Sequence, residues 1–275
     1  RLREHVRSRI VTAAGAIPAD RARRLTFALV GGGYTGTELA AELADWTADL
    51  AGGAGLAASE VRVVLVEARD RLLPGFPAGL AHAALGGLRR RGVEVRLEQP
   101  VAAVRADALL LASGERIPTE TVVWSGGVRA PHLLTDLGLP TASLGRVPVD
   151  DYLSVPGSPT VSAIGDCALV RDRQRGRDLP MTAHFAVQQG EHVARVIRAE
   201  LRGARPPVYR PRWVGEAISL GRDDAIAYVG PVPVRGAQAL AIRSYVQQRY
   251  LYGLGGLSLV RHLWDRRREP EPPGK

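Results

Sequence analysis

The chain has 275 residues, of which 45% are hydrophobic and 24% are charged, and its formal net charge is +9. This apolar content excludes a disordered chain, and the length suffices for one or two substantial cores. Nearly all of the positive charge comes from arginine, which favours anionic partners such as nucleotide phosphates, nucleic acid or acidic lipid headgroups. A well-solvated surface without a specific partner explains individual arginines equally well.

The single cysteine, Cys167, cannot form an intramolecular disulfide, which indicates a reducing setting such as the cytoplasm. No stretch of the sequence approaches the roughly 20 apolar residues that span a bilayer. We therefore expect a protein that is soluble or lies on a membrane surface. The sequence starts with Arg1 and its only methionine is Met181, so we expect a fragment or a processed product.

The first half of the chain predicts a βαβ pattern. Residues 1–24 are basic and predict a helix followed by a linker, with a break at IPAD (17–20). Apolar and helical periodicities then predict strand 25–30, helix 34–52, strand 60–68, helix 77–92 and strand 93–98. Residues 101–127 contain short alternating runs between polar turns, which predicts a small antiparallel meander that leads into a strand at 121–125.

The second half predicts shorter elements around one clear helix. An irregular return segment is expected over 131–156, and TVSAIGDCALV (160–170) predicts a strand that runs into a Gly-Asp turn. Helical spacing predicts a helix over 182–203. Short strands are expected over 207–235, and the tail from Ala237 predicts a helix that ends before the prolines of REPEPPGK.

Gly31, Gly33 and Gly36 form a G-x-G-x-x-G pattern between a predicted strand and a predicted helix. Gly31 permits the tight turn, Gly33 lets the backbone approach a pyrophosphate, and Gly36 allows close helix–strand packing. The helix N-terminus offers its N–H groups to the phosphates. Glu67 ends the next strand and is placed to accept hydrogen bonds from ribose hydroxyls, which predicts NADH rather than NADPH. The alternative is that Arg69 binds the 2′-phosphate of NADPH.

Two acids have both an ordinary and a functional interpretation. Glu38 lies in the first two turns of the helix, where the helix dipole stabilises a carboxylate, and this explanation is preferred to a role beside the reacting cofactor ring. Asp166 follows an apolar strand, which would place its carboxylate at the ligand-binding edge of a sheet. An Asx turn is the alternative for Asp166. No histidine or cysteine cluster has metal-ligand spacing, so no metal site is predicted.

Six sequence blocks carry a family resemblance: VGGGYTGTELAAEL, VVLVEARDRLLPGF, TVVWSGGVRA, GRVPVDDYLSVPG, AIGDCALV and TAHFAVQQG. In this order they resemble the type II NADH dehydrogenases, which are single-subunit, FAD-containing NADH:quinone oxidoreductases that lie on the membrane. The resemblance implies an α/β, two-dinucleotide-binding-domain flavoprotein fold, with a Rossmann-like NADH domain inserted in an FAD domain and a C-terminal amphipathic helical tail. Family members begin with another glycine-rich turn that this chain lacks, so we expect that the N-terminal FAD half is missing.

The resemblance divides the chain into four expected parts: a linker helix from the FAD domain (1–24), the NADH-binding domain (25–130), the C-terminal part of the FAD domain (131–206), and C-terminal strands with membrane-surface helices (207–275). The implied activity passes a hydride from NADH to FAD and then electrons to a membrane quinone. The implied location is peripheral, on the cytoplasmic face of the inner or plasma membrane. A homodimer is a possible assembly.

The resemblance also implies the site residues. Those expected to contact NADH are Gly31, Gly33, Tyr34, Gly36 and Glu67, with Gly126 and Gly127 on the nicotinamide side. Those expected to contact FAD are Gly165, Asp166, Thr182 and Ala183. The implied catalytic residues are Glu38, His184 and Gln188, with Gln189 also at the quinone entrance. The family usually has glutamine where this chain has His184, which leaves quinone contact at that position open.

The tail, residues 237–268, interleaves apolar residues with arginines. This pattern suits a helix in the plane of lipid headgroups, and a helix packed on its own domain is the alternative. Nucleic acid is disfavoured because aromatic residues make up only 5% of the chain. Two further functions stay open: an NADH–flavin reductase that serves a small redox protein, and a non-catalytic fragment that binds NADH only.

Overall fold

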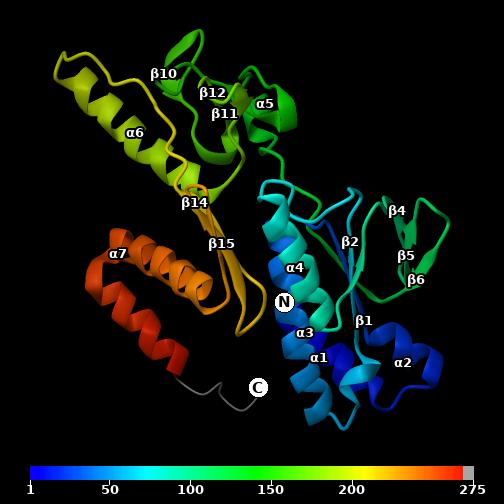
Figure 1. Cartoon of the computed structure of the whole chain (residues 1–275). Helices are drawn as coiled ribbons and strands as arrows, with labels where there is room; N and C mark the ends of the chain where they lie inside the picture. Colours follow the sequence, from blue (N-terminus) through cyan, green and yellow to red (C-terminus); the bar gives the residue numbers. More distant parts are fainter. Residues whose placement is uncertain (269–275) are drawn as a thin grey trace. The chain divides into compact units, whose positions relative to one another are not determined.

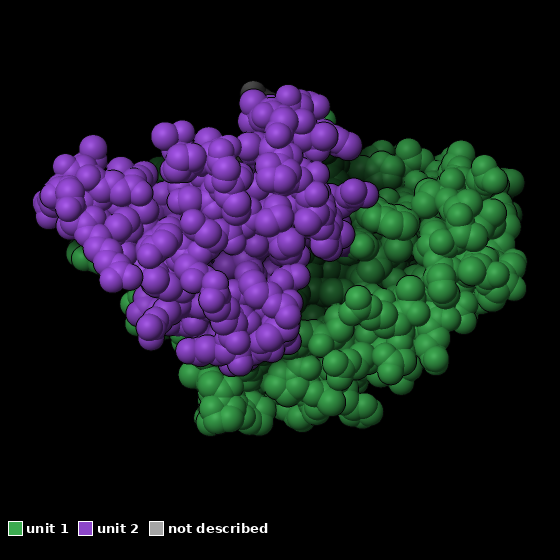
Figure 2. Space-filling view, turned by 90° about the horizontal axis from the view of Figure 1, so that it is seen from above, with its two compact units in different colours: residues 1–126, 214–275 green, residues 127–213 purple. Residues whose placement is uncertain are grey.

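The computed structural model describes residues 1–268 and divides into two compact units. Unit 1 comprises Arg1–Gly126 together with the chain from Val214 onward, and unit 2 comprises Gly127–Trp213 (Figures 1 and 2). The predicted α/β class is confirmed, since helices and strands alternate along the chain. The compact units meet at residues 126 and 213. The expected boundaries at residues 130 and 206 concern functional domains, so they stay a prediction.

Unit 1 contains the predicted βαβ pattern. Its first part consists of α1 (Leu2–Ala13), α2 (Pro18–Arg24), β1 (Thr26–Val30), α3 (Tyr34–Gly53), η1 (Ala58–Glu60), β2 (Arg62–Val66), α4 (Ala78–Arg90), β3 (Glu94–Arg96), β4 (Val101–Val104), β5 (Ala108–Leu111), β6 (Arg116–Pro118) and β7 (Thr121–Trp124). Its C-terminal part adds β14 (Gly215–Ser219), β15 (Ala225–Val229), β16 (Val232–Arg235) and α7 (Ala237–Arg268).

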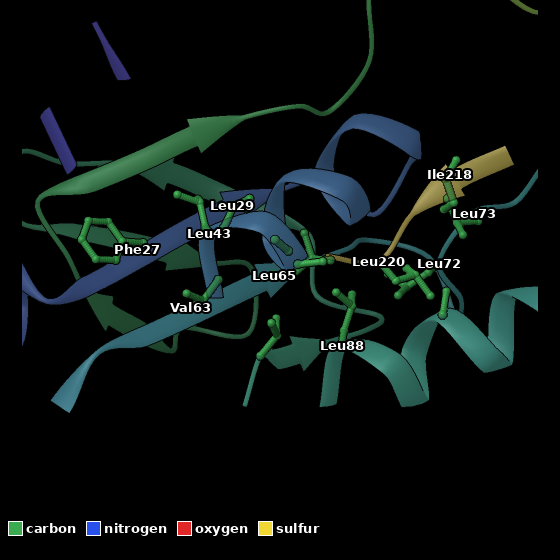
Figure 3. Packing of buried hydrophobic residues seen from close by; sticks show 14 of the residues in the cluster. Phe27, Leu29, Leu43, Val63, Leu65, Leu72, Leu73, Leu88, Ile218 and Leu220 are labelled. Atoms are coloured by element: carbon green, nitrogen blue, oxygen red, sulfur yellow. The ribbon is translucent and has the colours of Figure 1, made fainter. Parts of the chain in front are cut away.

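A parallel sheet in the order β3-β2-β1-β7 forms the centre of unit 1. Every residue of β1 is buried, which explains why its sequence, TFALV, shows no polar alternation. Phe27 and Leu29 share a core with α3 and α4, as Figure 3 shows. Ala28 and Val30 face the other side, where they pack with residues of the β4–β6 meander. Burial on both faces therefore fixes the sheet between two layers.

The C-terminal strands β14–β16 form an antiparallel sheet that is bonded to α3. The backbone N–H of Ser219 donates to Glu38 at 2.8 Å, and the Ser219 hydroxyl donates to Glu42 at 3.1 Å. One helical turn further on, the N–H of Arg222 donates to Asp45 at 3.0 Å. The acidic face of α3 is thus the docking face for the end of the chain, and it accounts for the place of the C-terminal strands in unit 1.

Unit 2 is built around one long helix, α6 (Ala183–Leu201), which confirms the helix predicted over 182–203. Its other elements are short: α5 (Leu133–Asp136), η2 (Ser143–Gly145), β8 (Val147–Pro148), β9 (Ser154–Val155), β10 (Ser158–Ser162), η3 (Gly165–Cys167), β11 (Ala168–Leu169), β12 (Arg171–Asp172) and β13 (Arg177–Asp178). Phe185 of α6 is buried in the core of this unit. The strand predicted to run into a Gly-Asp turn is β10, and Gly165, with φ +61°, begins the turn that follows it.

The linker predicted after the first helix is wrong, because residues 18–24 form α2. Pro18 occupies the first turn of α2. A proline there lacks only an N–H group that the first turn would leave without an intrahelical partner, and its fixed φ suits the helix. IPAD therefore ends the first helix and begins the second one.

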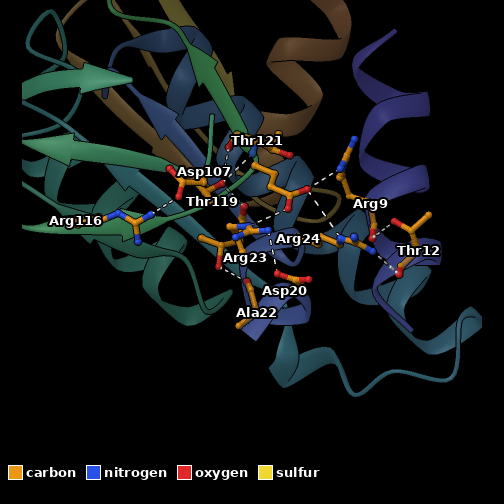
Figure 4. Close-up of polar contacts among 12 residues, drawn as sticks. Arg9, Thr12, Asp20, Ala22, Arg23, Arg24, Asp107, Arg116, Thr119 and Thr121 are labelled. Atoms are coloured by element: carbon orange, nitrogen blue, oxygen red, sulfur yellow. Dashed lines mark hydrogen bonds and ion pairs between the residues drawn. The ribbon is translucent and has the colours of Figure 1, made fainter. Parts of the chain in front are cut away.

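Glu120, which precedes β7, joins both N-terminal helices to the sheet. Figure 4 labels the arginines that it contacts, Arg9, Arg23 and Arg24. Its carboxylate accepts a hydrogen bond from Arg9 of α1 at 2.6 Å and one from Arg23 of α2 at 2.9 Å, and Arg24 approaches to 4.0 Å. The Glu120 side chain is only 16% exposed. Burial raises the pKa of this carboxyl, but the hydrogen bonds from Arg23 and Arg9 outweigh that effect and hold the pKa below its ordinary value of 4.5.

We expect Glu120→Gln to lower the free energy of unfolding by about 2 kcal/mol at neutral pH, because it leaves a cluster of arginines without their carboxylate. The contribution of Glu120 is complete above the unfolded pKa and is lost as the pH falls through the lowered folded pKa. The difference between wild type and variant should therefore shrink below pH 4.5. Urea denaturation over a series of pH values measures it.

Glu115→Gln is the matched control, because Glu115 is 43% exposed and pairs with Arg96 at 3.2 Å. An exposed ion pair contributes about 0–1 kcal/mol, so this variant should unfold almost like wild type. Equal losses in the two variants, or a Glu120 effect that persists in acid, would show that Glu120 does not hold the N-terminal helices through its charge.

Candidate functional site

Three strands of the parallel sheet bring predicted site residues to one edge of unit 1. Gly31 follows β1, Glu67 follows β2 and Gly126 lies just after β7. A Cβ on Gly31 would lie 2.6 Å from the backbone oxygen of Ser125 and 2.9 Å from Cα of Gly126, so the glycine turn touches the end of β7. The carboxyl edge of a parallel sheet is where α/β folds bind ligands. Gly127, the next residue, begins unit 2.

The glycine turn is tightly packed at Gly36 and has open space at Gly33. A Cβ on Gly36 would lie 1.8 Å from the backbone oxygen of Gly31, whereas a Cβ on Gly33 would meet nothing within 4 Å. Gly31 has φ +104°, which favours glycine. Gly33 caps α3 without a side-chain hydrogen bond, so the first N–H groups of the helix are available to an anion. This cradle fits a pyrophosphate, as the sequence predicts.

Ser125 is a residue of this edge that sequence reasoning missed. Its hydroxyl lies 2.8 Å from the backbone oxygen of Val30 and 3.2 Å from that of Gly31. It therefore bonds the end of β1 to the end of β7 and holds the glycine turn from the side opposite Glu67. The available signal was its position directly after an apolar strand and before two glycines.

Glu67 is fixed beside the turn by backbone hydrogen bonds. Its Oε2 accepts from the N–H of Gly32 at 2.6 Å, and its Oε1 accepts from the N–H of Arg69 at 2.8 Å. Each carboxylate oxygen can accept more than one hydrogen bond, so Glu67 keeps acceptor capacity for hydroxyl groups. The carboxylate is thus oriented in advance at the end of β2, and its contact with a ribose stays a prediction.

Tyr34, which was expected to contact the cofactor, also links α3 to β14. Its hydroxyl donates to Glu216. Its ring packs on Phe76 at a centroid distance of 5.4 Å, and Phe76 in turn packs edge-on against Tyr228 at 5.2 Å. This aromatic stack connects the start of the glycine helix to the C-terminal sheet. The cofactor contact of Tyr34 stays a prediction.

Glu38 has two partners that lie far away in the sequence. Its Oε1 accepts the N–H of Ser219 on β14 at 2.8 Å and the Nε–H of Arg243 on α7 at 3.2 Å. The helix dipole alone therefore does not account for this residue. The carboxylate fastens α3 to the C-terminal sheet and to α7, and no sequence signal near Glu38 indicates either partner.

In unit 2, the predicted FAD residues gather at the N-terminus of α6. The N–H of Gly165 donates to the buried Gln189 at 2.6 Å, and a Cβ on Gly165 would lie 3.3 Å from that of Ala186. Asp166, beside it in η3, is exposed. Gln189 thus holds the Gly-Asp turn against the helix.

The start of α6 leaves polar groups without protein partners. Thr182 is the N-cap residue, yet it makes no side-chain capping bond, and its buried hydroxyl has no hydrogen-bond partner among the residues that the structure describes. Ala183, the first residue of the helix, is exposed and adds no side-chain acceptor. Free N–H groups beside a buried hydroxyl fit an oxygen-rich ligand. The residues of this turn therefore fit the flavin nucleotide that the sequence predicts.

His184 and Gln188 are brought together with the backbone of Arg212. The Gln188 amide donates to the Arg212 oxygen at 3.0 Å and accepts the Arg212 N–H at 2.9 Å. His184 Nε2 lies 2.8 Å from the same oxygen and 2.7 Å from the Gln188 nitrogen, so it either donates to Arg212 or accepts from Gln188. Both predicted catalytic side chains therefore already hold the chain segment that follows α6.

Comparison with known proteins identifies the family. A sequence profile of the pyridine nucleotide-disulphide oxidoreductases matches residues 3–190, which include the glycine turn, Glu67, Gly165 and the start of α6. The chain belongs to this family. The membership agrees with the α/β fold and with the cradle at the carboxyl edge of the sheet.

Relatives within this family confirm the resemblance to the type II NADH dehydrogenases. The chain is 30% identical over 263 residues to a type II NADH:quinone oxidoreductase of Staphylococcus epidermidis, and the match covers 94% of this chain. It covers 65% of that relative, so the chain spans just under two thirds of its length. Among solved structures, NDH2 of Plasmodium falciparum in complex with NADH has a TM-score of 0.81 at 15% identity, over 96% of this chain and 71% of that one. A ferredoxin reductase from Rhodopseudomonas palustris has a TM-score of 0.57 at 24% identity, over 74% of this chain and 47% of that one.

Proposed function

We propose that this chain provides the NADH-binding part, and one portion of the FAD-binding part, of a flavin-dependent NADH:quinone oxidoreductase. The observation that carries the proposal is the cradle of unit 1. It combines a glycine turn, an uncapped helix N-terminus and Glu67, whose carboxylate is fixed by the Gly32 N–H at 2.6 Å. The similarity to type II NADH:quinone oxidoreductases supports NADH as the nucleotide and a quinone as the acceptor.

In this proposal, unit 1 binds and orients NADH. The N–H groups at the start of α3 bind the pyrophosphate across the open side of Gly33. Glu67 accepts hydrogen bonds from the adenosine ribose and excludes a 2′-phosphate by charge repulsion. Gly126 has no side chain of its own at the proposed nicotinamide end, and a Cβ there would lie 3.1 Å from the Trp124 ring. Gly127 has φ +114° and open space around its Cα.

Unit 2 would bind FAD at the start of α6. Gly165 and Asp166 lie on the turn that packs on this helix, while Thr182 offers its unpartnered hydroxyl. When bound, FAD would supply the redox chemistry, which is to accept a hydride from NADH and to pass electrons to a quinone. The N-terminal N–H groups of α6, from Ala183 on, favour negative charge on the ligand that they face.

The proposed catalytic residues act from the positions that the structure gives them. Glu38 presents a carboxylate bonded to Ser219 and Arg243, which limits its motion. His184 and Gln188 share the Arg212 oxygen, so a quinone that bonds to either residue competes with that backbone group. We propose that His184 exchanges a proton with the acceptor through its imidazole, whose ring nitrogens can both donate and accept hydrogen bonds.

The tail is proposed to lie on the membrane surface. The exposed apolar residues of α7 are Tyr245, Val246, Tyr250, Tyr252, Leu254 and Leu257. The helix breaks at Gly255 and Gly256, and no helix within residues 1–268 combines the length and apolar character needed to cross a bilayer. The predicted stripe also includes Val260, Trp264 and Arg266–Arg268, whose side chains lie outside the described residues.

Vesicle flotation tests this part of the proposal. Wild-type chain should float with vesicles of phosphatidylglycerol and phosphatidylcholine, and Leu254→Asp should weaken the association severalfold, because it puts a charge on the apolar face. Ser258→Asp is the control for added charge. Equal flotation of all three proteins would contradict the membrane proposal, and self-association that is lost in Leu254→Asp would indicate a homodimer interface instead. Protease accessibility in inverted vesicles then tests the cytoplasmic face.

The redox proposal is tested by the visible absorption spectrum of the 275-residue chain after incubation with FAD and removal of free FAD. We expect bound flavin that loses its colour when NADH is added without oxygen and regains it with a water-soluble quinone. Gly33→Ala should bind flavin but should not respond to NADH, since Gly33 belongs to unit 1. Recovery of colour with an acidic ferredoxin but not with a quinone would instead favour a reductase of a small redox protein. A colourless chain that still binds NADH would reject catalysis by these residues alone.

A further inference from the structure

A second polar pocket lies within unit 2, away from the start of α6. It has a volume of 290 Å³ and lies between α6 and the extended segment 207–212. Gln188, His192 and Arg195 line it from α6, where their spacing of four and three residues puts them on one helical face. Tyr209, Arg210 and Arg212 are among the residues that line it from the segment.

Hydrogen bonds hold both ends of this segment. Tyr209 donates its backbone N–H to the Asp151 oxygen at 2.7 Å. Gln188 makes its two bonds with the backbone of Arg212. Trp213, which follows, donates its indole N–H to the buried Asp172 at 2.8 Å. The pocket is therefore built from fixed walls rather than from a loose loop.

The pocket is strongly positive. Three of its residues are arginines, Arg195, Arg210 and Arg212, and all three are exposed. Among the residues that the structure describes, no ion pair joins any of these three to a carboxylate, although arginines elsewhere in unit 2 do pair, such as Arg173 with Asp151 at 2.9 Å. Three arginines at the wall of one cavity, without an acidic partner in the described part of the chain, favour an anion with several oxygens.

Two buried polar atoms of the pocket also have no partner. His192 is only 2% exposed, and its Nε2 makes no hydrogen bond in the described part of the chain. The Tyr209 hydroxyl is likewise buried without a hydrogen bond of ordinary geometry, although the amide of Gln189 is near enough to affect its pKa. The His192 and Tyr209 rings pack against each other at 5.1 Å. Buried polar groups usually have partners, so two such atoms in one pocket indicate a ligand.

The pKa directions of Tyr209 and His192 are consistent with an anionic ligand. Burial raises the pKa of Tyr209 to about 12, so its hydroxyl remains a hydrogen-bond donor at neutral pH. Burial and the charge of Arg195 both lower the pKa of His192, so its ring is neutral in the empty pocket. Three arginines do not suit a cationic ligand, and an apolar ligand would leave the buried Nε2 of His192 without a hydrogen-bond partner.

We propose that this pocket binds the phosphate group of a phosphomonoester, with Arg195, Arg210 and Arg212 as its cations and Tyr209 and His192 as its neutral donors. The proposal goes beyond the oxidoreductase function and does not depend on it, because none of these five side chains is assigned to NADH, FAD or the quinone. Gln188, which also lines the pocket, takes no part in the phosphate proposal. The phosphate would come either from a small soluble molecule or from the headgroup of a lipid such as phosphatidic acid.

Titration calorimetry of the 275-residue chain with inorganic phosphate, at constant ionic strength, tests the proposal. Wild type should show saturable binding, and Arg195→Gln combined with Arg210→Gln should weaken it at least tenfold. Tyr209→Phe, which keeps the ring and removes only the hydroxyl, should weaken it severalfold. Arg198→Gln combined with Arg202→Gln removes the same charge from the same end of α6 outside the pocket and should change little.

A second readout reports on the buried ring. Because an anion stabilises the charged imidazole, inorganic phosphate should raise the pKa of His192 in wild type but not in the Arg195 and Arg210 double variant, as measured by NMR of the ring protons. Absence of saturable binding, or equal losses in the two double variants, would overturn the proposal.

Flotation with phosphatidylcholine vesicles, with and without phosphatidic acid, separates the two sources. Binding to the acidic vesicles that needs Arg195 and Arg210 and is displaced by inorganic phosphate assigns a lipid headgroup. Phosphate binding in solution with no preference for phosphatidic acid assigns a soluble phosphomonoester. The NADH response of the flavin spectrum should stay intact in Tyr209→Phe, so failure here is distinguishable from failure of the proposed function.

Discussion

Gly36→Ala is expected to abolish NADH binding and to lower the free energy of unfolding by on the order of 3 kcal/mol. The added Cβ would lie 1.8 Å from the backbone oxygen of Gly31 and 2.7 Å from the Ser125 hydroxyl. Neither neighbour is the free end of a flexible side chain, so α3 has to move away from β1. The first N–H groups of the helix would then leave the position in which they face the pyrophosphate. Urea denaturation and the fluorescence of bound NADH measure the two losses.

Gly33→Ala is the matched control, because it should lower the NADH affinity without lowering the free energy of unfolding by a comparable amount. Gly33 has φ −74°, which alanine adopts without strain, and its Cβ meets nothing within 4 Å. The free energy of unfolding should therefore stay within about 1 kcal/mol of wild type, the usual range for changing an N-cap residue. NADH affinity should fall about a hundredfold, because the methyl group occupies the space that the pyrophosphate needs. Normal NADH affinity in Gly33→Ala would refute the cradle.

Glu67→Ala is the second variant with a large expected effect. The dissociation constant for NADH should rise about 10- to 100-fold, since hydrogen bonds to a charged group contribute about 1.5–3 kcal/mol. NADPH should lose much less, because removal of the carboxylate also removes its repulsion of the 2′-phosphate. The ratio of the two dissociation constants is therefore the decisive measurement. A purely structural Glu67, which fixed only the Gly32 and Arg69 N–H groups, would weaken both nucleotides equally.

Asp70→Ala controls for loss of negative charge on the same loop, because Asp70 is exposed and lies three residues after Glu67. It should leave both dissociation constants within a factor of two, as surface substitutions usually change little. A preference for NADPH in Asp70→Ala as well would show that the general charge of the loop, rather than the placement of one carboxylate, selects the nucleotide.

Local physics made the glycine turn at the carboxyl edge of the parallel sheet predictable. The sequence TFALV has no polar alternation because β1 is buried on both faces, and this property can be recognised before the fold is known. The spacing of the glycines predicts a tight turn with close helix–strand packing. Glu67 directly follows a strand that must lie beside β1 in a βαβ unit. The long helices α3 and α6 were predictable for the same reason, since their periodicity is a property of consecutive residues.

Contacts across long stretches of sequence were not predictable. Glu38 bonds to Ser219 and Arg243, which lie 181 and 205 residues further along, so its helix position suggested only the dipole. Gln188 and His184 were expected at a quinone, yet Gln188 bonds to the backbone of Arg212, and His184 Nε2 lies 2.8 Å from the Arg212 oxygen. Hydrogen-bond partners of this kind depend on which elements pack together, and periodicity carries no information about that.

The sequence by itself therefore determined the α/β class, the glycine turn and the family, because each depends on residues that are close together in the chain. Only the tertiary structure decided that the C-terminal strands belong with the parallel sheet of unit 1, through the acidic face of α3. Only the structure, too, placed a buried His192, whose Nε2 has no partner in the described part of the chain, at a pocket with three arginines. Burial and the absence of a hydrogen-bond partner are properties of the packed chain, and no local pattern specifies them.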